Sequence, residues 1–178
     1  MEVTRTNLEG CFILEPKVFG DERGYFFESF NKEKFKNLTS FEINFVQDNE
    51  AFSNKGILRG LHFQKGEYAQ AKLVRVVKGK VLDVAVDLRK DSDTYGKHFS
   101  IILSEENKKQ LFVSRGFAHG YAVLEDNTIF QYKCDNFYSP ENESGIRYDD
   151  EDLNIDWKLK EEEIILSDKD KILKSFKK

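Results

Sequence analysis

The middle of the chain reads Lys72-Leu-Val-Arg-Val-Val-Lys-Gly-Lys-Val-Leu-Asp-Val-Ala-Val-Asp-Leu88. Hydrophobic residues alternate from Lys72 to Val77 and again from Val81 to Leu88, and a period of two is typical of β-strands. Lys78-Gly79 separates the two runs and suits a tight turn. The pattern therefore predicts a β-hairpin at the centre of the fold.

The alternation also assigns side chains to the two faces of this hairpin. One face would carry Lys72, Val74, Val76, Val81, Asp83 and Ala85, and the other would carry Leu73, Arg75, Val77, Leu82, Val84 and Val86. Lys72 and Asp83 would then lie near each other. A charge pair is costly to bury for packing alone, so this pair indicates a functional role.

Other segments extend the β-rich pattern on both sides of the hairpin. Further strands are expected at 97–103, 109–113, 117–124 and 128–134, the last two joined by Glu125-Asp126-Asn127. Short strands at this spacing predict an all-β sandwich or barrel.

Helices are expected only at the edges of the sequence. Asn31 can cap a short helix over 31–38, and Ser167 can cap a last one that holds Ile172, Leu173 and Phe176. The tail after Trp157 is otherwise rich in charge and is interpreted as a solvated face.

Length and composition limit the class of protein. The 178 residues predict a single domain over 1–178, and sixteen phenylalanines with only two prolines favour a β-rich globule. The net charge of −4 comes without a basic stripe, which argues against nucleic-acid binding. No apolar run approaches the length of a membrane span.

The two cysteines point to a reducing compartment. Cys11 and Cys134 form neither a metal-spaced pair nor a disulfide framework. The first residues lack the apolar core of a signal peptide. We therefore expect a cytoplasmic protein with no membrane partner.

His62 is the first candidate for chemistry, because it lies in the strand-like run Gly56-Ile-Leu-Arg-Gly-Leu-His-Phe-Gln64. Taken alone, it is more simply interpreted as a hydrogen-bonded core histidine, since a general base needs a carboxylate partner that spacing cannot identify. Arg59 and His62 would face opposite ways in a regular strand. A bulge at Gly60 could bring both to one side.

Other polar residues could bind an anion or a metal. Arg23, Arg59, Lys72 and Arg75 are the available cations, and surface solvation is the preferred reading of Arg75. A His-x-His metal motif is broken because Gln64 stands in its second position. His62, Glu67 and His119 would remain as a facial triad, but no metal is expected.

Longer motifs run in one order along nearly the whole chain. They are Phe19–Glu28, Gln47–Asn49, Gly56–Gln64, Ala69–Arg75, Asp83–Arg89, Gly116–Gly120, Tyr132-Lys133, Tyr138–Pro140, Ile155–Trp157 and Leu166–Asp170. In these motifs the chain closely resembles the dTDP-4-dehydrorhamnose 3,5-epimerase family, a cofactor-free group of cupins. The resemblance implies a mainly β fold, a cupin jelly roll or double-stranded β-helix with a few short peripheral helices.

The resemblance also implies a reaction and a set of catalytic residues. The substrate would be a dTDP-linked 4-keto-6-deoxy sugar, whose carbonyl acidifies the hydrogens on C3 and C5. His62 would be the base and Asp170 the carboxylate that orients it. Lys72 would stabilise the enolate oxygen, Asp83 would keep Lys72 charged and aimed, and Tyr132 would be the acid.

Substrate-binding residues are implied in the same way. The resemblance assigns Arg23, Glu28, Gln47, Asp48, Asn49, Arg59, Lys72, His119, Tyr138, Glu143 and Lys169 to the nucleotide sugar. Arg23, Arg59 and His119 would contact the diphosphate or the sugar, and Tyr138 would stack on the thymine. The family also implies a homodimer in which Arg23 and Glu28 serve the neighbouring subunit's site.

The chain departs from the family pattern at Phe112, Ser114 and Tyr148. None of these is an expected catalytic residue, but pocket walls can alter substrate preference. The alternatives that stay open are an epimerase working at C3 or C5 alone on a related nucleotide sugar and a non-catalytic sugar-nucleotide-binding cupin. A ketoisomerase of the same fold and a metal-dependent oxygenase are less favoured, because Gln64 breaks the His-x-His pair.

Overall fold

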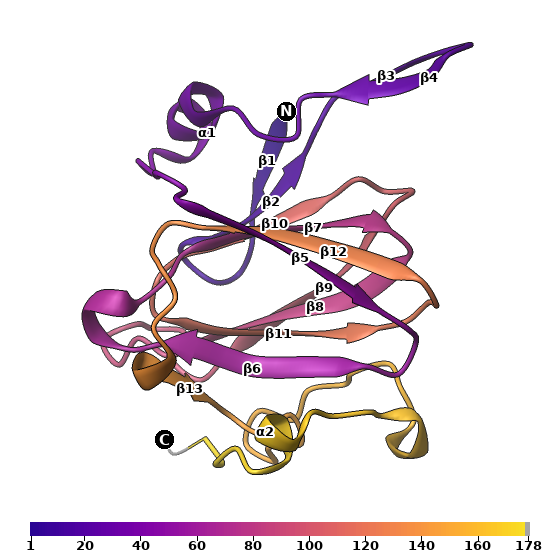
Figure 1. Ribbon diagram of the computed structural model, residues 1–178. Helices are drawn as coiled ribbons and strands as arrows, with labels where there is room; N and C mark the ends of the chain where they lie inside the picture. Colours follow the sequence, from indigo (N-terminus) through magenta and orange to yellow (C-terminus); the bar gives the residue numbers. More distant parts are fainter. Residues whose placement is uncertain (177–178) are drawn as a thin grey trace.

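The structure, a computed structural model, describes residues 1–176 and consists of two antiparallel sheets packed face to face (Figure 1). One sheet has the order β1 (Glu2–Arg5), β2 (Cys11–Glu15), β10 (Gln110–Val113), β7 (Lys72–Lys78), β12 (Thr128–Cys134) and β5 (Gln47–Ser53). The other has the order β13 (Glu143–Gly145), β6 (Leu58–Gln64), β11 (Phe117–Val123), β8 (Lys80–Asp87) and β9 (His98–Ser104). The strands predicted from 97 to 134 are confirmed within a residue or two.

A two-stranded arm projects from this body. It consists of β3 (Val18–Asp21) and β4 (Gly24–Phe27), which pair only with each other (Figure 1). Its exposed side chains include Phe19, at 55%, and Phe26, at 70%. The arm therefore carries apolar surface that the described residues leave uncovered.

Helices are short and peripheral. They are α1 (Lys32–Thr39), α2 (Asp168–Lys171) and the 3₁₀ turns η1 (Gly66–Tyr68), η2 (Pro140–Asn142) and η3 (Glu161–Glu163). Asn31 caps α1 by accepting a hydrogen bond from the backbone N–H of Lys34, as predicted. Among the helices of residues 1–176, none is long and apolar enough to cross a membrane.

The last helix ends earlier than predicted. Ser167 caps α2, but the helix stops at Lys171, before Leu173 and Phe176. After Lys171 the chain turns towards the core, where Phe176 is buried. Its backbone N–H donates to Asp150, and its ring packs 5.3 Å from that of Tyr95.

The predicted central hairpin is wrong. β7 pairs with β10 and β12, whereas β8 pairs with β11 and β9, so the two strands lie in opposite sheets. Gly79 turns the chain between them with φ +80, where an added Cβ would lie 2.3 Å from Thr128 Oγ1. An alternating pattern followed by a glycine fits a corner between sheets as well as a hairpin turn.

The connection at 125–127 is a corner of the same kind. β11 lies in the five-stranded sheet and β12 in the six-stranded one, so the two strands do not pair with each other. His119 and Tyr132 instead enter one interior from opposite walls.

The predicted faces are partly right. Val74, Val76, Val81 and Ala85 do pack in one cluster between the sheets, as expected for one face. The other set is divided, because Leu73 packs on the outer side of the six-stranded sheet and Leu82, Val84 and Val86 on the outer side of the five-stranded one. The division follows from the corner at Gly79.

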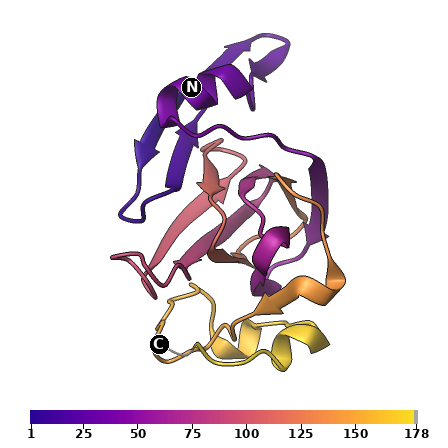
Figure 2. The same cartoon turned by 90° about the vertical axis from the view of Figure 1, so that its left-hand side faces the viewer.

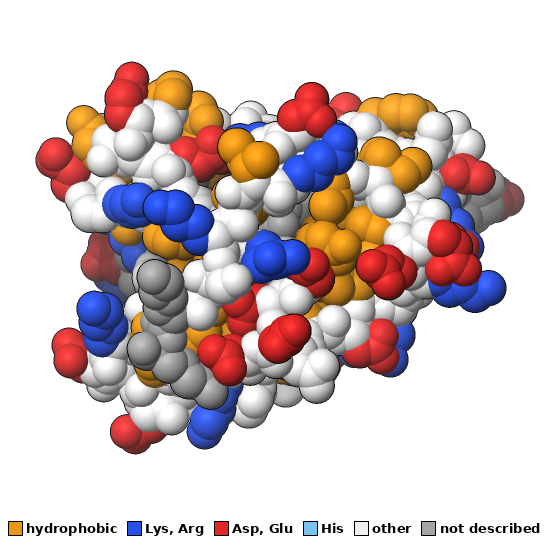
Figure 3. Space-filling view, turned by 90° about the horizontal axis from the view of Figure 1, so that it is seen from below, with side chains coloured by type: hydrophobic (Ala, Val, Ile, Leu, Met, Phe, Trp, Pro, Cys, Tyr) orange, Lys and Arg blue, Asp and Glu red, His pale blue; other side chains and the backbone are white. Residues whose placement is uncertain are grey.

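The C-terminal segment forms a third layer below the five-stranded sheet (Figures 1 and 2). Trp157 and Phe176 are buried there, which corrects the prediction of a solvated tail. The outer surface of this segment does carry charged side chains, with hydrophobic ones among them (Figure 3). The six-stranded sheet covers one face of β8 and the C-terminal segment covers the other, so β8 is buried from Val81 to Asp87. The whole is a cupin-type jelly roll, as the resemblance implied.

Asp87 ends β8 in a buried polar cluster. Its carboxylate accepts hydrogen bonds from Arg89 Nη2 at 2.7 Å, Ser92 Oγ at 2.6 Å and Thr94 Oγ1 at 2.6 Å. Burial alone raises the pKa of Asp87, but these hydrogen bonds outweigh it and hold the pKa well below its usual 3.8. The cluster ties the loop after β8 to the sheet.

We expect Asp87→Asn to lower the free energy of unfolding by about 2–4 kcal/mol, since it leaves the Arg89 guanidinium without its charged partner. Because folding lowers the pKa of Asp87, its contribution is complete above about pH 4 and is lost as the pH falls further. Urea unfolding at several pH values checks this, with the exposed Asp93→Asn as control. Equal stability of both variants at pH 7 would contradict the role of Asp87.

Candidate active site

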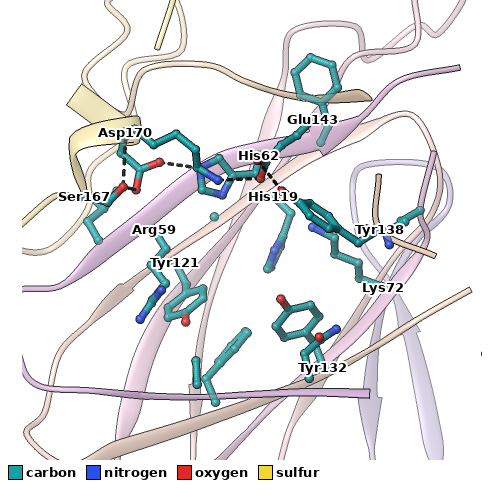
Figure 4. Close-up of a pocket in the computed structure, with 18 of the residues that line it drawn as sticks. Arg59, His62, Lys72, His119, Tyr121, Tyr132, Tyr138, Glu143, Ser167 and Asp170 are labelled. Carbon is teal, nitrogen blue, oxygen red and sulfur yellow. Dashed lines mark hydrogen bonds and ion pairs between the residues drawn. The ribbon is translucent and has the colours of Figure 1, made fainter. Parts of the chain in front are cut away.

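A cavity of about 760 Å³ opens between the two sheets, beside the C-terminal segment. Its walls come from β5, β6, β7, β11, β12, β13 and α2, so both sheets and the tail contribute (Figure 4). Of the predicted site residues, it is lined by Gln47, Asn49, Arg59, His62, Lys72, His119, Tyr132, Tyr138, Glu143, Lys169 and Asp170.

His62 and Asp170 form the shortest polar contact of the cavity. His62 Nε2 lies 2.5 Å from Asp170 Oδ1, although the two residues are 108 positions apart. Ser167 Oγ donates to the other carboxylate oxygen at 2.9 Å. Burial alone raises the pKa of Asp170, but the hydrogen bond from His62 helps to lower it below its usual value. An ionised carboxylate therefore holds Nε2 and leaves Nδ1 as the ring nitrogen available for proton transfer.

Gly60 explains why Arg59 and His62 line the same cavity. The pairing of β6 with β11 shifts between His119–His62 and Tyr121–Arg59, which is the predicted bulge. Gly60 adopts φ +116, and an added Cβ would lie 2.7 Å from the Cα of Gly120. Any larger residue would push the two strands apart.

Lys72 and Tyr132 face the cavity from the opposite sheet. The Lys72 ammonium lies 5.9 Å from the centre of the Tyr132 ring. Burial lowers the pKa of Lys72, and the nearby Cys134, Asp83 and Glu143 oppose that effect. Burial raises the pKa of Tyr132, so its phenol stays protonated at neutral pH. The cavity thus holds an amine and a phenol across from His62.

Glu143 connects the rim of the cavity to α2. It accepts hydrogen bonds from Lys169 Nζ at 2.7 Å and from the Tyr138 hydroxyl at 2.9 Å (Figure 4). Burial alone raises the pKa of Glu143, but these donors outweigh it and lower the pKa. α2 therefore supports the cavity twice, through Asp170 and through the neighbouring Lys169.

Asp83 was expected to keep Lys72 charged and aimed, but its carboxylate contacts His119 instead. Both of its carboxylate oxygens contact His119 Nε2, at 2.9 and 3.0 Å. It does raise the pKa of Lys72 through its charge, but its hydrogen bonds go to His119. Asp83 lies behind the cavity wall and is fully buried.

Besides Asp83, three predicted site residues lie outside this cavity. Asp48 points away from it, because it alternates along β5 with Gln47 and Asn49, and it pairs with Lys133 on the outer face. Arg23 lies at the tip of the β3–β4 arm, paired with Asp21, and Glu28 follows the arm, paired with Lys34.

Sequence reasoning missed some of the lining. Tyr121 and Phe130 stack with ring centroids 4.0 Å apart, and both face the cavity. Each lies two residues along a strand from a predicted site residue, His119 or Tyr132, so the period of two could have identified them. Ser167 was expected only as a helix cap, and it also holds Asp170.

Glu67 and the three positions that depart from the family pattern do not line the cavity. Glu67 lies in η1 away from the cavity, and within residues 1–176 no three His, Cys, Asp or Glu side chains come together as a metal site. Phe112 packs against Phe35 on the outer side of the six-stranded sheet, with ring centroids 4.9 Å apart. Neither Ser114 nor Tyr148 lines the cavity, so all three departures from the family pattern lie away from it.

The arrangement suits proton transfer at a carbon next to a carbonyl. It presents a histidine backed by a carboxylate, an ammonium that can stabilise an oxyanion, and a phenol on the facing wall. Arginine, amide and tyrosine side chains around them can bind a polar, anionic substrate.

Comparison with known proteins agrees with this geometry. The family model described as dTDP-4-dehydrorhamnose 3,5-epimerase matches residues 5–178. The chain is 52% identical over 173 residues to the dTDP-4-dehydrorhamnose 3,5-epimerase of Escherichia coli K12, covering 97% of this chain and 93% of that protein.

Solved structures give the same result. An enzyme of that description from Elizabethkingia anophelis NUHP1 superposes with a TM-score of 0.96 at 53% identity, covering 99% of this chain and 96% of that one. A dTDP-6-deoxy-D-glucose-3,5-epimerase from Legionella pneumophila in complex with dTDP-4-keto-L-rhamnose gives 0.94 at 46%, covering 98% and 92%. This chain belongs to the dTDP-4-dehydrorhamnose 3,5-epimerase family.

Proposed function

We propose that this protein epimerises C3 and C5 of dTDP-4-dehydro-6-deoxy-D-glucose and thereby forms dTDP-4-dehydro-L-rhamnose. The observation that carries the proposal is the His62–Asp170 pair, which faces Tyr132 and Lys72 across one cavity. A binding protein needs no base with a carboxylate behind it and no acid opposite. The family membership of the chain supports the same activity.

The reaction begins with removal of a carbon-bound proton. The C4 carbonyl of the sugar acidifies the hydrogens on C3 and C5, and His62 Nδ1 takes one of them. Asp170 stabilises the imidazolium that forms. The electron pair moves to O4, and the resulting enolate lies beside the Lys72 ammonium, which stabilises it electrostatically.

A proton returned on the other face of the ring inverts the centre. Tyr132 is suited to supply it, because its raised pKa keeps the phenol protonated and because it projects from the opposite sheet. His62 then releases its proton to solvent and Tyr132 takes one up, so the same groups can act at the second centre. No redox step occurs, so the proton taken and the proton returned balance the reaction.

The nucleotide part of the substrate would occupy the outer part of the cavity. Tyr138 lies at the rim with 48% of its surface exposed and can stack on the thymine. Arg59, Gln47 and Asn49 offer donors to the diphosphate and the sugar. Glu143 and Lys169 complete the rim.

We propose a homodimer in which the β3–β4 arm serves the neighbouring subunit. The arm exposes apolar side chains that need a cover, and it carries Arg23 at its tip, 86% exposed. In such a dimer Arg23 and Glu28 would add donors and charge to the neighbour's nucleotide site. The cytoplasmic location inferred from two unpaired cysteines stays a prediction.

An epimerase that acts at one centre would use the same groups, so exchange at each carbon is the deciding measurement. We expect incubation with dTDP-4-dehydro-6-deoxy-D-glucose in deuterium oxide to introduce deuterium at both C3 and C5, observed by NMR. His62→Ala should abolish both exchanges and leave dTDP affinity within about 3-fold. Exchange at one carbon only would indicate a monofunctional enzyme, and exchange at neither would contradict the proposed activity.

Asp170 should affect kcat only through its contact with His62. We expect Asp170→Asn to lower kcat by about 10²- to 10⁴-fold with little change in dTDP affinity, because the neutral amide cannot stabilise the imidazolium. Asp168→Asn is the matched control on the same helix, since the Asp168 side chain is 99% exposed. An Asp170→Asn enzyme as active as the control would contradict the role assigned to the pair.

The shared site can be tested with hybrid dimers. His62→Ala damages the site in its own subunit, whereas Arg23→Ala would damage the neighbour's. If the arm crosses the interface, a mixture of the two variants, unfolded and refolded together, regains about a quarter of wild-type activity, because half of the dimers are hybrids with one intact site. Activity no higher than the average of the separate variants would show that Arg23 does not serve the neighbouring site.

A further inference from the structure

His119 belongs to a second histidine–carboxylate pair in the same cavity. Its Nε2 contacts both oxygens of Asp83, and the pair is almost completely removed from solvent, with His119 7% and Asp83 0% exposed. Within residues 1–176, His119 is the only hydrogen-bond partner that the Asp83 side chain has. A carboxylate buried with one partner is held in one geometry.

The strands that carry this pair lie at the centre of the five-stranded sheet. β11 lies between β6 and β8, with His119 opposite His62 on one side and opposite Ala85 on the other. Asp83 is two residues from Ala85, so its side chain shares the face of β8 that Ala85 presents and reaches His119 diagonally. The position of the His119 ring is therefore fixed by a side chain of the neighbouring strand β8, and the proposed base His62 lies on the strand at its other side.

The contact also determines which ring nitrogen faces the substrate. A carboxylate can only accept, so the Nε2 of His119 carries the hydrogen. No hydrogen bond involves Nδ1 of His119 among the described residues, and no buried side-chain nitrogen or oxygen among them lacks a partner. Nδ1 must therefore open into the cavity, as Nδ1 of His62 does.

Lys72 is the other residue that Asp83 could serve, but the geometry favours His119. The charge of Asp83 opposes the lowering of the Lys72 pKa by burial, as does that of Glu143. No ion pair or hydrogen bond joins Asp83 to Lys72 within residues 1–176, whereas Asp83 makes two contacts with His119. Asp83 affects the pKa of Lys72 only through its negative charge. It affects His119 through a carboxylate oxygen that accepts a hydrogen bond from Nε2.

We propose that Asp83 is a positioning residue that acts through His119: it fixes the ring so that Nδ1 meets an oxygen atom of the reacting sugar. The sugar is favoured over the diphosphate because His119 lies directly opposite His62, the proposed base. This inference rests on the proposed function for the identity of the sugar. The placement of the ring does not depend on it.

The placement is tested first without substrate. In ¹⁵N-labelled protein, long-range proton–nitrogen NMR should show His119 as the Nε2-protonated tautomer. Asp83→Ala should remove that preference, and Asp83→Asn should keep most of it, because the amide oxygen can still accept. An unchanged His119 spectrum in Asp83→Ala would overturn the proposal, whatever the enzyme's substrate.

Activity then distinguishes the two residues that Asp83 could serve. We expect Asp83→Ala to lower kcat on the order of 10²-fold and Asp83→Asn to lower it less than about 10-fold, with dTDP affinity nearly unchanged in both. If Asp83 acts by its charge on Lys72, Asn and Ala are equally damaging, which would overturn the proposal. A loss of dTDP affinity as large as the loss of kcat would contradict the assignment to the sugar.

A double-mutant cycle completes the test. His119→Gln keeps an amide donor for Asp83, so the carboxylate stays paired, but it places no group where Nδ1 was. In this background Asp83→Ala, or Asp83→Asn if the alanine variant does not fold, should change kcat less than about 3-fold. The same loss in both backgrounds would overturn the proposal. Failure of the wild type to exchange deuterium would contradict the proposed function and leave the NMR result on His119 standing.

Discussion

The chain passes from one sheet to the other at most of its connections, and the cavity exists because of this constraint. β5 and β6, β7 and β8, and β11 and β12 are consecutive in sequence but lie in opposite sheets. Side chains of one parity on all of these strands therefore point into a shared interior. Lys72 and Tyr132 face His62 and His119 across it, so the proposed base His62 and the proposed acid Tyr132 stand on opposite walls (Figure 4).

The C-terminal segment completes this interior from outside the sheets. It covers the outer face of the five-stranded sheet with Trp157 and Phe176, and its short helix α2 delivers Asp170 to His62 and Lys169 to Glu143. Packing of the tail and the geometry of the base are thus coupled. A substitution that loosens the tail should affect catalysis although it lies far from the substrate.

The sequence located the strands and the helix starts better than it predicted which strands pair with each other. Alternation located β7, β8, β9, β10, β11 and β12, and Asn31 and Ser167 marked the helix starts, because these signals are local. The corners at Gly79 and at 125–127 were read as hairpin turns, since a local pattern does not say which sheet receives the next strand. The same limitation hid the diagonal contact between Asp83 and His119.

Long-range contacts came from the family resemblance or were missed. Spacing could not connect His62 with Asp170, which lies 108 residues away. The family resemblance included Asp48 with Gln47 and Asn49 as one motif, although alternation places Asp48 on the other face of β5. Tyr121 and Phe130 could have been found by that same alternation.

The central claim is that His62 and Tyr132 act on opposite faces of one sugar ring. A crystal structure with an unreactive dTDP-linked deoxysugar bound tests it most directly. The account predicts the ring between the two side chains, with His62 Nδ1 facing the C3 and C5 hydrogens, the Tyr132 hydroxyl on the other face and O4 beside Lys72. A sugar with both side chains on the same face, or with O4 turned away from Lys72, would contradict it.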